Sequence, residues 1–190
     1  MKIGIFGGGF DPVHIGHTFS VQYILDKKYV ERIIVIPTYR QPLKEEYSTP
    51  FGIRLAMATE AFRKFSEVLV SDIEGSLPLP SYTIYTLKKL KEDYPNDKLF
   101  LIIGDDEASN IVKWHRYDEL KKYTNFIIIR RFCEEIKYDR TFFKDAIVVD
   151  NPVIEISSSL IRELIKEGVR VDGLVPENVL KIIVNERLYT

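Results

Sequence analysis

The sequence predicts an α/β protein with a doubly wound, mostly parallel sheet and a small helical cluster near its C-terminal end. Short apolar runs alternate with stretches of helical periodicity, which is the pattern of βαβ units. The apolar runs are rich in Ile, Val, Leu and Phe, as strands covered on both faces tend to be. We expect a single domain over residues 1–190, with a helical part from about 157 to 190.

The apolar runs predict strands, in order, at 2–6, 32–37, 67–73, 98–103, 125–130 and 146–149. The periodic stretches between and after them predict helices at 15–28, 50–64, 82–93, 117–122, 158–167 and 177–187. Thr49 before Pro50 and Ser81 before Tyr82 are typical of helix starts. Because ligands bind at the carboxyl ends of the strands in such sheets, the loops after the strands are the places to search for a site.

The bulk properties indicate a soluble cytoplasmic protein without nucleic-acid or membrane partners. Lys and Arg number 27 against 28 Asp and Glu, so the chain is not a general polycation. Its single cysteine, Cys133, excludes an internal disulfide. No apolar run approaches the ~20 residues of a membrane span. The sequence leaves the oligomeric state open, with a homo-oligomer among the options.

The segment 7–17, which follows the first predicted strand, indicates a nucleotide-phosphate site. Its glycines let the backbone approach a ligand closely, and the helix that follows offers unpaired N–H groups to an anion. Two histidines three residues apart can both face that anion. Zinc is an alternative for such a pair, but it needs a third ligand that the chain does not offer at a convincing spacing. The contacts expected from this segment are Gly7, Gly8, Gly9, Phe10, His14 and His17.

Each loop after the next three predicted strands has two interpretations, one as a ligand contact and one as an ordinary structural feature. After the second strand, Lys44 or Arg40 would cover a triphosphate, or the loop is simply solvated. After the third, the N–H groups around Thr83 would receive a substrate anion, or the segment is only a stiff turn with a cap. After the fourth, Asp106 beside Gly104 would bind a ribose or cap a helix.

Three later features extend the candidate site. Trp114, the only tryptophan, is either a core residue or a ring that stacks on a flat heterocycle. Arg131 and its neighbour Arg130 are possible phosphate ligands after the fifth strand. Ser157 and Ser158 can cap a helix that carries Arg162, which would make a second anion site or only a plain cap with a surface arginine.

Together these residues resemble the bacterial nicotinate-nucleotide adenylyltransferase family of the nucleotidyltransferase superfamily, over nearly the whole chain. The family motif G-G-T-F-D-P-x-H-x-G-H corresponds to residues 7–17, and P-S-Y-T to 80–83. G-x-D with a later tryptophan corresponds to 104–106 and Trp114, and I-S-S-T-x-I-R to 156–162. The chain departs from the family where it has Gly9 for threonine, Leu43 for histidine, His115 for tyrosine, and Arg131-Phe132 without the usual proline and glycine.

The resemblance implies transfer of AMP from ATP to nicotinate mononucleotide, giving deamido-NAD and pyrophosphate in NAD biosynthesis. The 5′-phosphate of the mononucleotide, with a second pKa near ~6, would be the nucleophile and need no general base. Mg²⁺ would be held mainly through the ATP phosphates, with no dedicated metal site in the protein. The catalytic residues implied are His14, His17, Lys44 and Arg162. The ATP contacts implied are the segment 7–10 with both histidines, Gly104, Asp106, Ile156, Ser157, Ser158 and Arg162, and the mononucleotide contacts are Thr83, Trp114, His115 and Arg131.

Other functions share parts of this pattern. Nicotinamide mononucleotide differs from nicotinate mononucleotide only by an amide for a carboxylate, so it stays an alternative acceptor. Phosphopantetheine adenylyltransferases and class I aminoacyl-tRNA synthetases also carry His-x-Gly-His, but the Trp114 region argues against the first and the lack of a Lys-Met-Ser-Lys-Ser loop against the second. A noncatalytic nucleotide sensor is the alternative outside the enzymes.

Overall fold

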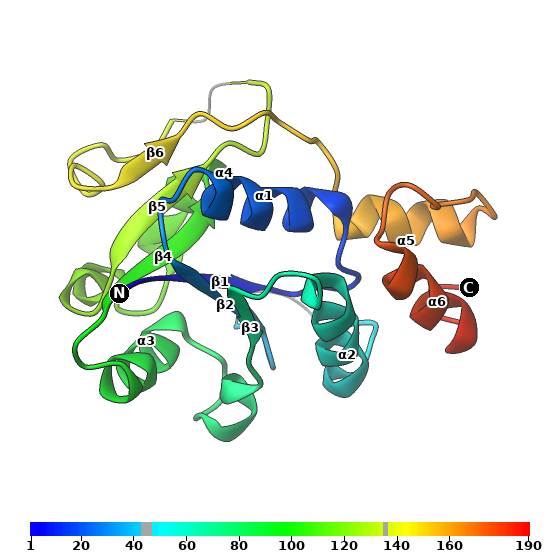
Figure 1. Ribbon diagram of the computed structural model, residues 1–190, viewed down its shortest axis with the longest axis horizontal. Helices are drawn as coiled ribbons and strands as arrows, with labels where there is room; N and C mark the ends of the chain where they lie inside the picture. Colours follow the sequence, from blue (N-terminus) through cyan, green and yellow to red (C-terminus); the bar gives the residue numbers. More distant parts are fainter. Residues whose placement is uncertain (43–46, 135–136) are drawn as a thin grey trace.

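A six-stranded sheet forms the centre of the computed structural model, which describes residues 1–42, 47–134 and 137–190 (Figure 1). The strands lie in the order β3-β2-β1-β4-β5-β6, and every neighbouring pair is parallel. The chain builds outward from β1 to one edge and then from β4 to the other, so the topological switch lies between β1 and β4. The strands are β1 (Lys2–Gly8), β2 (Arg32–Pro37), β3 (Val68–Val70), β4 (Lys98–Gly104), β5 (Asn125–Ile129) and β6 (Ile147–Val149).

Helices cover both faces of this sheet, which confirms the doubly wound prediction; α1 and α3 lie on opposite sides of it (Figure 1). The α-helices are α1 (Ile15–Asp26), α2 (Phe51–Phe62), α3 (Thr83–Asp93), α4 (Asp105–Ser109), α5 (Ser158–Lys166) and α6 (Glu177–Asn185). Short 3-10 turns occupy Ile73–Ser76, Ile111–Lys113 and Tyr117–Lys122.

Alternate residues along the four central strands, β1, β2, β4 and β5, divide the core in two. On one face, Phe6 and Val35 pack with α1, α2, α5 and α6. On the other face, Ile5 and Ile34 pack with α3, α4 and the 3-10 turns near them. Since successive strand side chains point to opposite faces, a strand buried on both sides must be apolar at every position. This explains why the strands appear in the sequence as continuous apolar runs.

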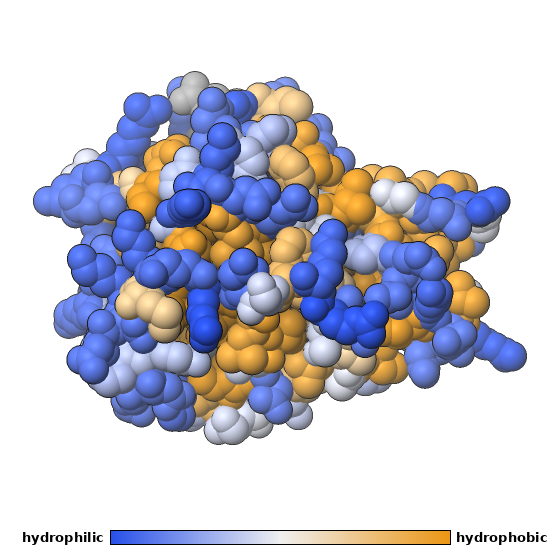
Figure 2. All heavy atoms as spheres, viewed as in Figure 1, coloured by the Kyte–Doolittle hydropathy of each residue, from blue (hydrophilic) through white to orange (hydrophobic). Residues whose placement is uncertain are grey.

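The C-terminal helices α5 and α6 lie beside each other beyond one end of the sheet, in orange and red (Figure 1). Ile161 of α5 and Val179 of α6 belong to the same core cluster as residues of α1 and α2. Hydrophobic residues reach the surface in the middle of the viewed face, among hydrophilic ones (Figure 2). Within the described residues, no helix combines the length and apolar character that crossing a bilayer requires.

The expected ends of helices and strands differ from the observed ones, in part because side chains expected to cap a helix bond to residues distant in the sequence instead. Two predicted helix caps are wrong. The Ser81 hydroxyl accepts the N–H of Arg40 at 3.0 Å, and α3 begins two residues later. The Thr49 hydroxyl donates to the hydroxyl of Tyr189 at 3.1 Å, and α2 has no side-chain cap. The strand expected at 67–73 is only Val68–Val70, and the helix expected at 117–122 is a 3-10 turn.

Candidate active site

A cavity of about 1060 Å³ lies at the carboxyl ends of the central strands. Its wall combines the turn after β1, the start of α3, the segment after β4, and residues of α1 and α5. Arg40, one candidate triphosphate contact, does not line the cavity. The other predicted site residues that the structure describes do line it: Gly7, Gly8, Gly9, Phe10, His14, His17, Thr83, Gly104, Asp106, Trp114, His115, Arg130, Arg131, Ile156, Ser157, Ser158 and Arg162. Lys44 and Leu43 lie outside the described residues.

The turn between β1 and α1 is held in place by side chains from two other helices. Arg54 of α2 donates from Nη1 to the carbonyl oxygen of Gly9 at 2.8 Å. From α5, Arg162 Nη1 donates to the carbonyl oxygen of Asp11 at 2.7 Å, and the Ser158 hydroxyl donates to that of Pro12 at 2.8 Å. Carbonyl oxygens would repel a phosphate. Tying three of them to donors therefore suits a turn that receives an anion.

The two histidines at the start of α1 form one unit. Their rings stack with centroids 3.6 Å apart. The backbone N–H of His14 donates to Nδ1 of His17 at 3.2 Å, so the neutral ring of His17 carries its proton on Nε2. Burial lowers the pKa of His14 to about 3. Burial, the neighbouring His14 and then Arg131 hold the pKa of His17 well below its usual value. Near pH 7 the pair therefore offers neutral hydrogen-bond donors.

The Nδ1 atom of His14 has no hydrogen-bond partner, although it is buried. It is the single side-chain nitrogen or oxygen in that condition within the part of the chain that the structure describes. Leaving such an atom unpaired costs about 1–3 kcal/mol, which native structures accept mostly at functional sites. Its position on the cavity wall fits a site that is completed by a ligand or a bound water.

Asp106 and Arg131 meet across the end of β4. Arg131 Nη1 lies 3.0 Å from Asp106 Oδ2, and both side chains line the cavity. A Cβ atom on Gly104 would lie 2.3 Å from Asp106 Oδ1 and 2.4 Å from Arg131 Cδ, so a side chain at this strand end would force the ion pair to move. The Asp105 carboxylate beneath accepts the N–H groups of Asp106 at 3.0 Å and Arg131 at 3.2 Å. The predicted ribose and mononucleotide contacts therefore form one ion pair in this structure.

The predicted acceptor contacts gather at another part of the wall. Thr83 is the first residue of α3, where unpaired N–H groups are found. The His115 ring stacks on Tyr82, with centroids 4.2 Å apart. Trp114 packs against the core cluster of the α3 face and also lines the cavity, so both readings of this residue fit its position. Tyr82 itself was not singled out in the sequence.

Three buried polar residues of the site escaped sequence reasoning. Arg54 is only 1% exposed and donates to the carbonyl oxygens of Gly9, Thr38, Tyr39 and Thr49. Asp11 is 3% exposed. Its carboxylate accepts the hydroxyls of Tyr189 at 2.6 Å and Ser48 at 2.9 Å. An arginine within an otherwise apolar helix stripe was the available signal for Arg54, but its four carbonyl partners lie in two separate connections, β1–α1 and β2–α2.

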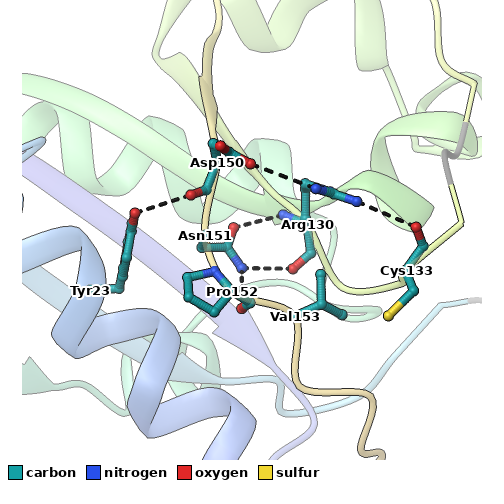
Figure 3. Close-up of a pocket in the computed structure, with 7 residues that line it drawn as sticks. All are labelled: Tyr23, Arg130, Cys133, Asp150, Asn151, Pro152 and Val153. Carbon is teal, nitrogen blue, oxygen red and sulfur yellow. Dashed lines mark hydrogen bonds and ion pairs between the residues drawn. The ribbon is translucent and has the colours of Figure 1, made fainter.

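Asn151 is the third such residue, and Figure 3 shows its amide between the backbones of two segments. It accepts the N–H of Arg130 at 2.9 Å and donates to the carbonyl oxygens of Arg130 at 2.9 Å and Pro152 at 3.0 Å. These bonds fix the chain after β6 to the end of β5. They also shape a second hollow of about 550 Å³ that shares Arg130, Asn151 and Pro152 with the main cavity (Figure 3).

Metal ligands do not gather at this site. Among the described residues there is no group of three or more His, Cys, Asp or Glu side chains that could hold a metal ion. Two groups on the cavity wall could still each donate an electron pair to a metal ion: the unpartnered Nδ1 of His14 and the carboxylate of Asp106. A metal ion that enters with its ligand needs few protein donors, because phosphate and water oxygens complete its shell.

The sequence is similar to known proteins over its whole length. A protein-family model described as cytidylyltransferase-like matches residues 5–164. The chain is 38% identical to a probable nicotinate-nucleotide adenylyltransferase of Fusobacterium nucleatum, covering 98% of each chain. It is 37% identical to one of Carboxydothermus hydrogenoformans, covering 99% of this chain and 98% of the relative. The chain belongs to the nicotinate-nucleotide adenylyltransferase family.

Solved structures share the fold of this chain. A Plasmodium falciparum nicotinic acid mononucleotide adenylyltransferase complexed with NaAD has a TM-score of 0.82 at 24% identity, with 99% of this chain and 97% of that chain covered. The same protein complexed with APC has a TM-score of 0.77 at 25% identity, with coverage of 99% and 96%. The parallel sheet with helices on both faces is therefore the Rossmann-like fold of the nucleotidyltransferases, as the sequence predicted.

Proposed function

We propose that this protein transfers AMP from ATP to nicotinate mononucleotide, releasing pyrophosphate and forming deamido-NAD. The observation that carries the proposal is the composition of one cavity wall. The turn between β1 and α1, called the phosphate-type turn below, lies with its two neutral histidines on the wall of this cavity. The stacked rings of Tyr82 and His115, at the start of α3, line the same cavity. The name of the relatives, nicotinate-nucleotide adenylyltransferase, describes a reaction that needs both a phosphate-binding site and a site for the pyridine nucleotide.

The reaction needs no nucleophile from the protein. An oxygen of the mononucleotide's 5′-phosphate attacks the α-phosphorus of ATP, and the bond from that phosphorus to the bridging oxygen of the β-phosphate breaks. Pyrophosphate leaves with the electron pair. Since a phosphate monoester is largely dianionic at neutral pH, no general base is required. The task of the protein is alignment of the two phosphates and stabilisation of charge on their oxygens.

The neutral histidines fit this electrostatic task. Nε2 of His17 donates without carrying a net charge, and the stacked arrangement with His14 fixes its direction. Arg162 supplies a cation at the same wall, already oriented by its bond to the Asp11 carbonyl oxygen. Donors fixed before the reaction stabilise the transition state without a reorganisation cost. Lys44 is a further proposed triphosphate contact.

The mononucleotide is proposed to bind by Thr83, Trp114, His115 and Arg131. Trp114 would stack on the pyridine ring, and N–H groups around Thr83 and His115 would receive the nicotinate carboxylate. Asp106 would bind a ribose hydroxyl once its ion pair with Arg131 opens. Gly104, Ile156, Ser157 and Ser158 are proposed to line the ATP side of the cavity.

Magnesium is proposed to enter with ATP, held mainly by phosphate and water oxygens. It would neutralise charge on the triphosphate and the leaving pyrophosphate. We further propose that the chain works as one domain in the cytoplasm without nucleic acid.

A pyrophosphate-release assay with purified protein, ATP and Mg²⁺ tests the function. The acceptor is nicotinate mononucleotide, nicotinamide mononucleotide or phosphopantetheine, each at the same concentration. We expect the highest kcat/KM with nicotinate mononucleotide and no release without an acceptor. A preference for either other acceptor contradicts the proposed substrate. ATP binding without release of pyrophosphate with any of them identifies a nucleotide sensor instead.

A further inference from the structure

Gly9 lies against the ring of Tyr47, a residue to which neither the motifs nor the comparisons assign a role. A Cβ atom built on Gly9 would be 2.6 Å from Cε1 and 3.2 Å from the hydroxyl oxygen of Tyr47. Carbon atoms in proteins do not approach that closely without moving. Both residues line the large cavity, beside His17 and Phe10. The ring of Tyr47 therefore occupies the space that any side chain at position 9 would need.

The ring is held from other directions as well. The guanidinium carbon of Arg54 lies 3.9 Å from the ring centroid, in a cation–π contact. Arg54 is fully buried and cannot retreat, because its nitrogens bond the carbonyl oxygens of Gly9, Thr38 and Thr49. The Tyr47 hydroxyl donates to Oε1 of Gln41 at 2.9 Å, which anchors the far end of the ring.

These contacts make a closed packing unit around the phosphate-type turn. Arg54 bonds the carbonyl oxygen of Gly9 from one direction, while Tyr47 packs on Gly9 and on Arg54 at once. Burial raises the pKa of the Tyr47 phenol, so its hydroxyl keeps its proton at neutral pH. The uncharged ring of Tyr47 therefore packs against the turn at Gly9, in the place that a side chain of residue 9 would otherwise fill.

We infer that Tyr47 is a positioning residue for the nucleotide, which sets the shape of the Gly-rich turn by filling the place of a residue-9 side chain. The inference rests on the proposed function, since it takes the turn to receive the ATP phosphates. It makes Gly9 and Tyr47 a matched pair: a larger residue at position 9 is tolerated only when the ring at position 47 is removed. The effect falls on ATP affinity more than on the rate of the chemical step.

A double-mutant cycle with Gly9→Ala, Tyr47→Ala and the combined variant tests this coupling. The measured quantities are the Kd of ATP by titration calorimetry, KM for ATP, kcat and Tm. We expect Gly9→Ala to weaken ATP binding by ~10-fold in the parent protein and by less than ~3-fold in the Tyr47→Ala background. Tyr47→Phe keeps the ring without its hydroxyl, so it should preserve the full sensitivity to Gly9→Ala.

Equal factors in both backgrounds would overturn the inference. So would variants that change Tm but leave the Kd and KM of ATP unchanged, because Tyr47 would then be a packing residue only. If Gly9→Ala alone does not fold, restored folding in the combined variant supports the coupling, and continued misfolding contradicts it. A parent protein that binds ATP but transfers nothing contradicts the proposed function, and the calorimetric cycle still decides the role of Tyr47.

Discussion

At the residue scale, the two histidines show what the sequence can and cannot predict. Their positions can be read from the sequence, whereas their protonation state depends on the surrounding fold. His14 and His17 could be selected from the sequence because they lie three residues apart at a helix start. Their neutral state could not, because it comes mainly from burial, which for His17 includes ring contacts with Phe6 and Phe10. Desolvation disfavours the charged imidazole and lowers its pKa.

Replacing His17 with Ala removes the oriented Nε2 donor while leaving the turn's carbonyl contacts intact. We expect kcat for pyrophosphate release to fall by ~10²-fold, the typical cost of losing one donor to a developing negative charge. Ser20→Ala, one turn further along α1 on the same cavity wall, is the matched control and should keep most of the activity. A folded His17→Ala protein with the parent kcat would remove this histidine from catalysis.

The lowered pKa of His14 predicts how stability depends on pH. The unfolded chain binds a proton near its ordinary pKa of 6.5, whereas the folded chain binds it only near about 3. Between these values the unfolded state holds more protons, so stability falls as pH falls. From pH 7 to pH 5 this single group should lower the free energy of unfolding by about 2 kcal/mol.

Urea unfolding of the parent and of His14→Gln at both pH values isolates this contribution. The variant should lose about that much less stability on acidification, whatever its stability at pH 7. His115→Gln, at an exposed histidine, is the comparison substitution. Identical pH dependence in the parent and in His14→Gln would mean that His14 titrates alike in both states.

At the element scale, the repeated β-strand and α-helix pattern determines which loops can form a site. The switch between β1 and β4 brings the turn after β1 beside Gly104, where the sequence predicted two halves of one ligand site. Element ends were less predictable. Ser81 and Thr49 look like caps in isolation, but partners distant in sequence take their hydroxyls. The Ser157 cap of α5 does form, because its bond to the Leu160 N–H is local.

The short helix α4 and the turn after it show the same limit. The sequence assigned no periodic helix between Gly104 and Trp114 and gave a helix start at Asp106 only as one of two interpretations, yet α4 begins directly at the end of β4. Three acidic residues open this helix, which suits the positive end of a helix dipole. One of them, Asp106, turns to Arg131 after β5 instead of only capping. A contact between two strand ends decides this orientation, so no local pattern reveals it.

At the scale of the whole molecule, the C-terminal segment of the chain contacts the phosphate-type turn between β1 and α1. The Tyr189 hydroxyl, one residue before the C-terminal residue, donates to the Asp11 carboxylate at 2.6 Å. Ser48 donates to the other oxygen of that carboxylate at 2.9 Å, and Thr49 donates to the Tyr189 hydroxyl. This network joins the turn after β1, the start of α2 and the end of the chain.

Removing the Tyr189 hydroxyl should therefore destabilise the whole fold. Tyr189→Phe keeps the ring but leaves one oxygen of a buried carboxylate without its donor, at a cost of about 1–3 kcal/mol in the free energy of unfolding. Chemical denaturation measures it. Tyr29→Phe, at another half-buried tyrosine of the same core face, is the control and should change little. Equal losses in the two variants would show that the bond to Asp11 contributes nothing specific.

The sequence by itself determined the parallel α/β fold, the strand ends around the cavity, and part of the set of residues on the cavity wall. These follow from hydrophobic periodicity and from short motifs whose residues are neighbours along the chain. Only the tertiary structure decided that the histidines are neutral, that Asp106 pairs with Arg131, and that Arg54, Asp11 and Tyr47 shape the turn. Burial and contacts between distant segments cause these effects, and neither can be predicted from residues that are neighbours in the sequence.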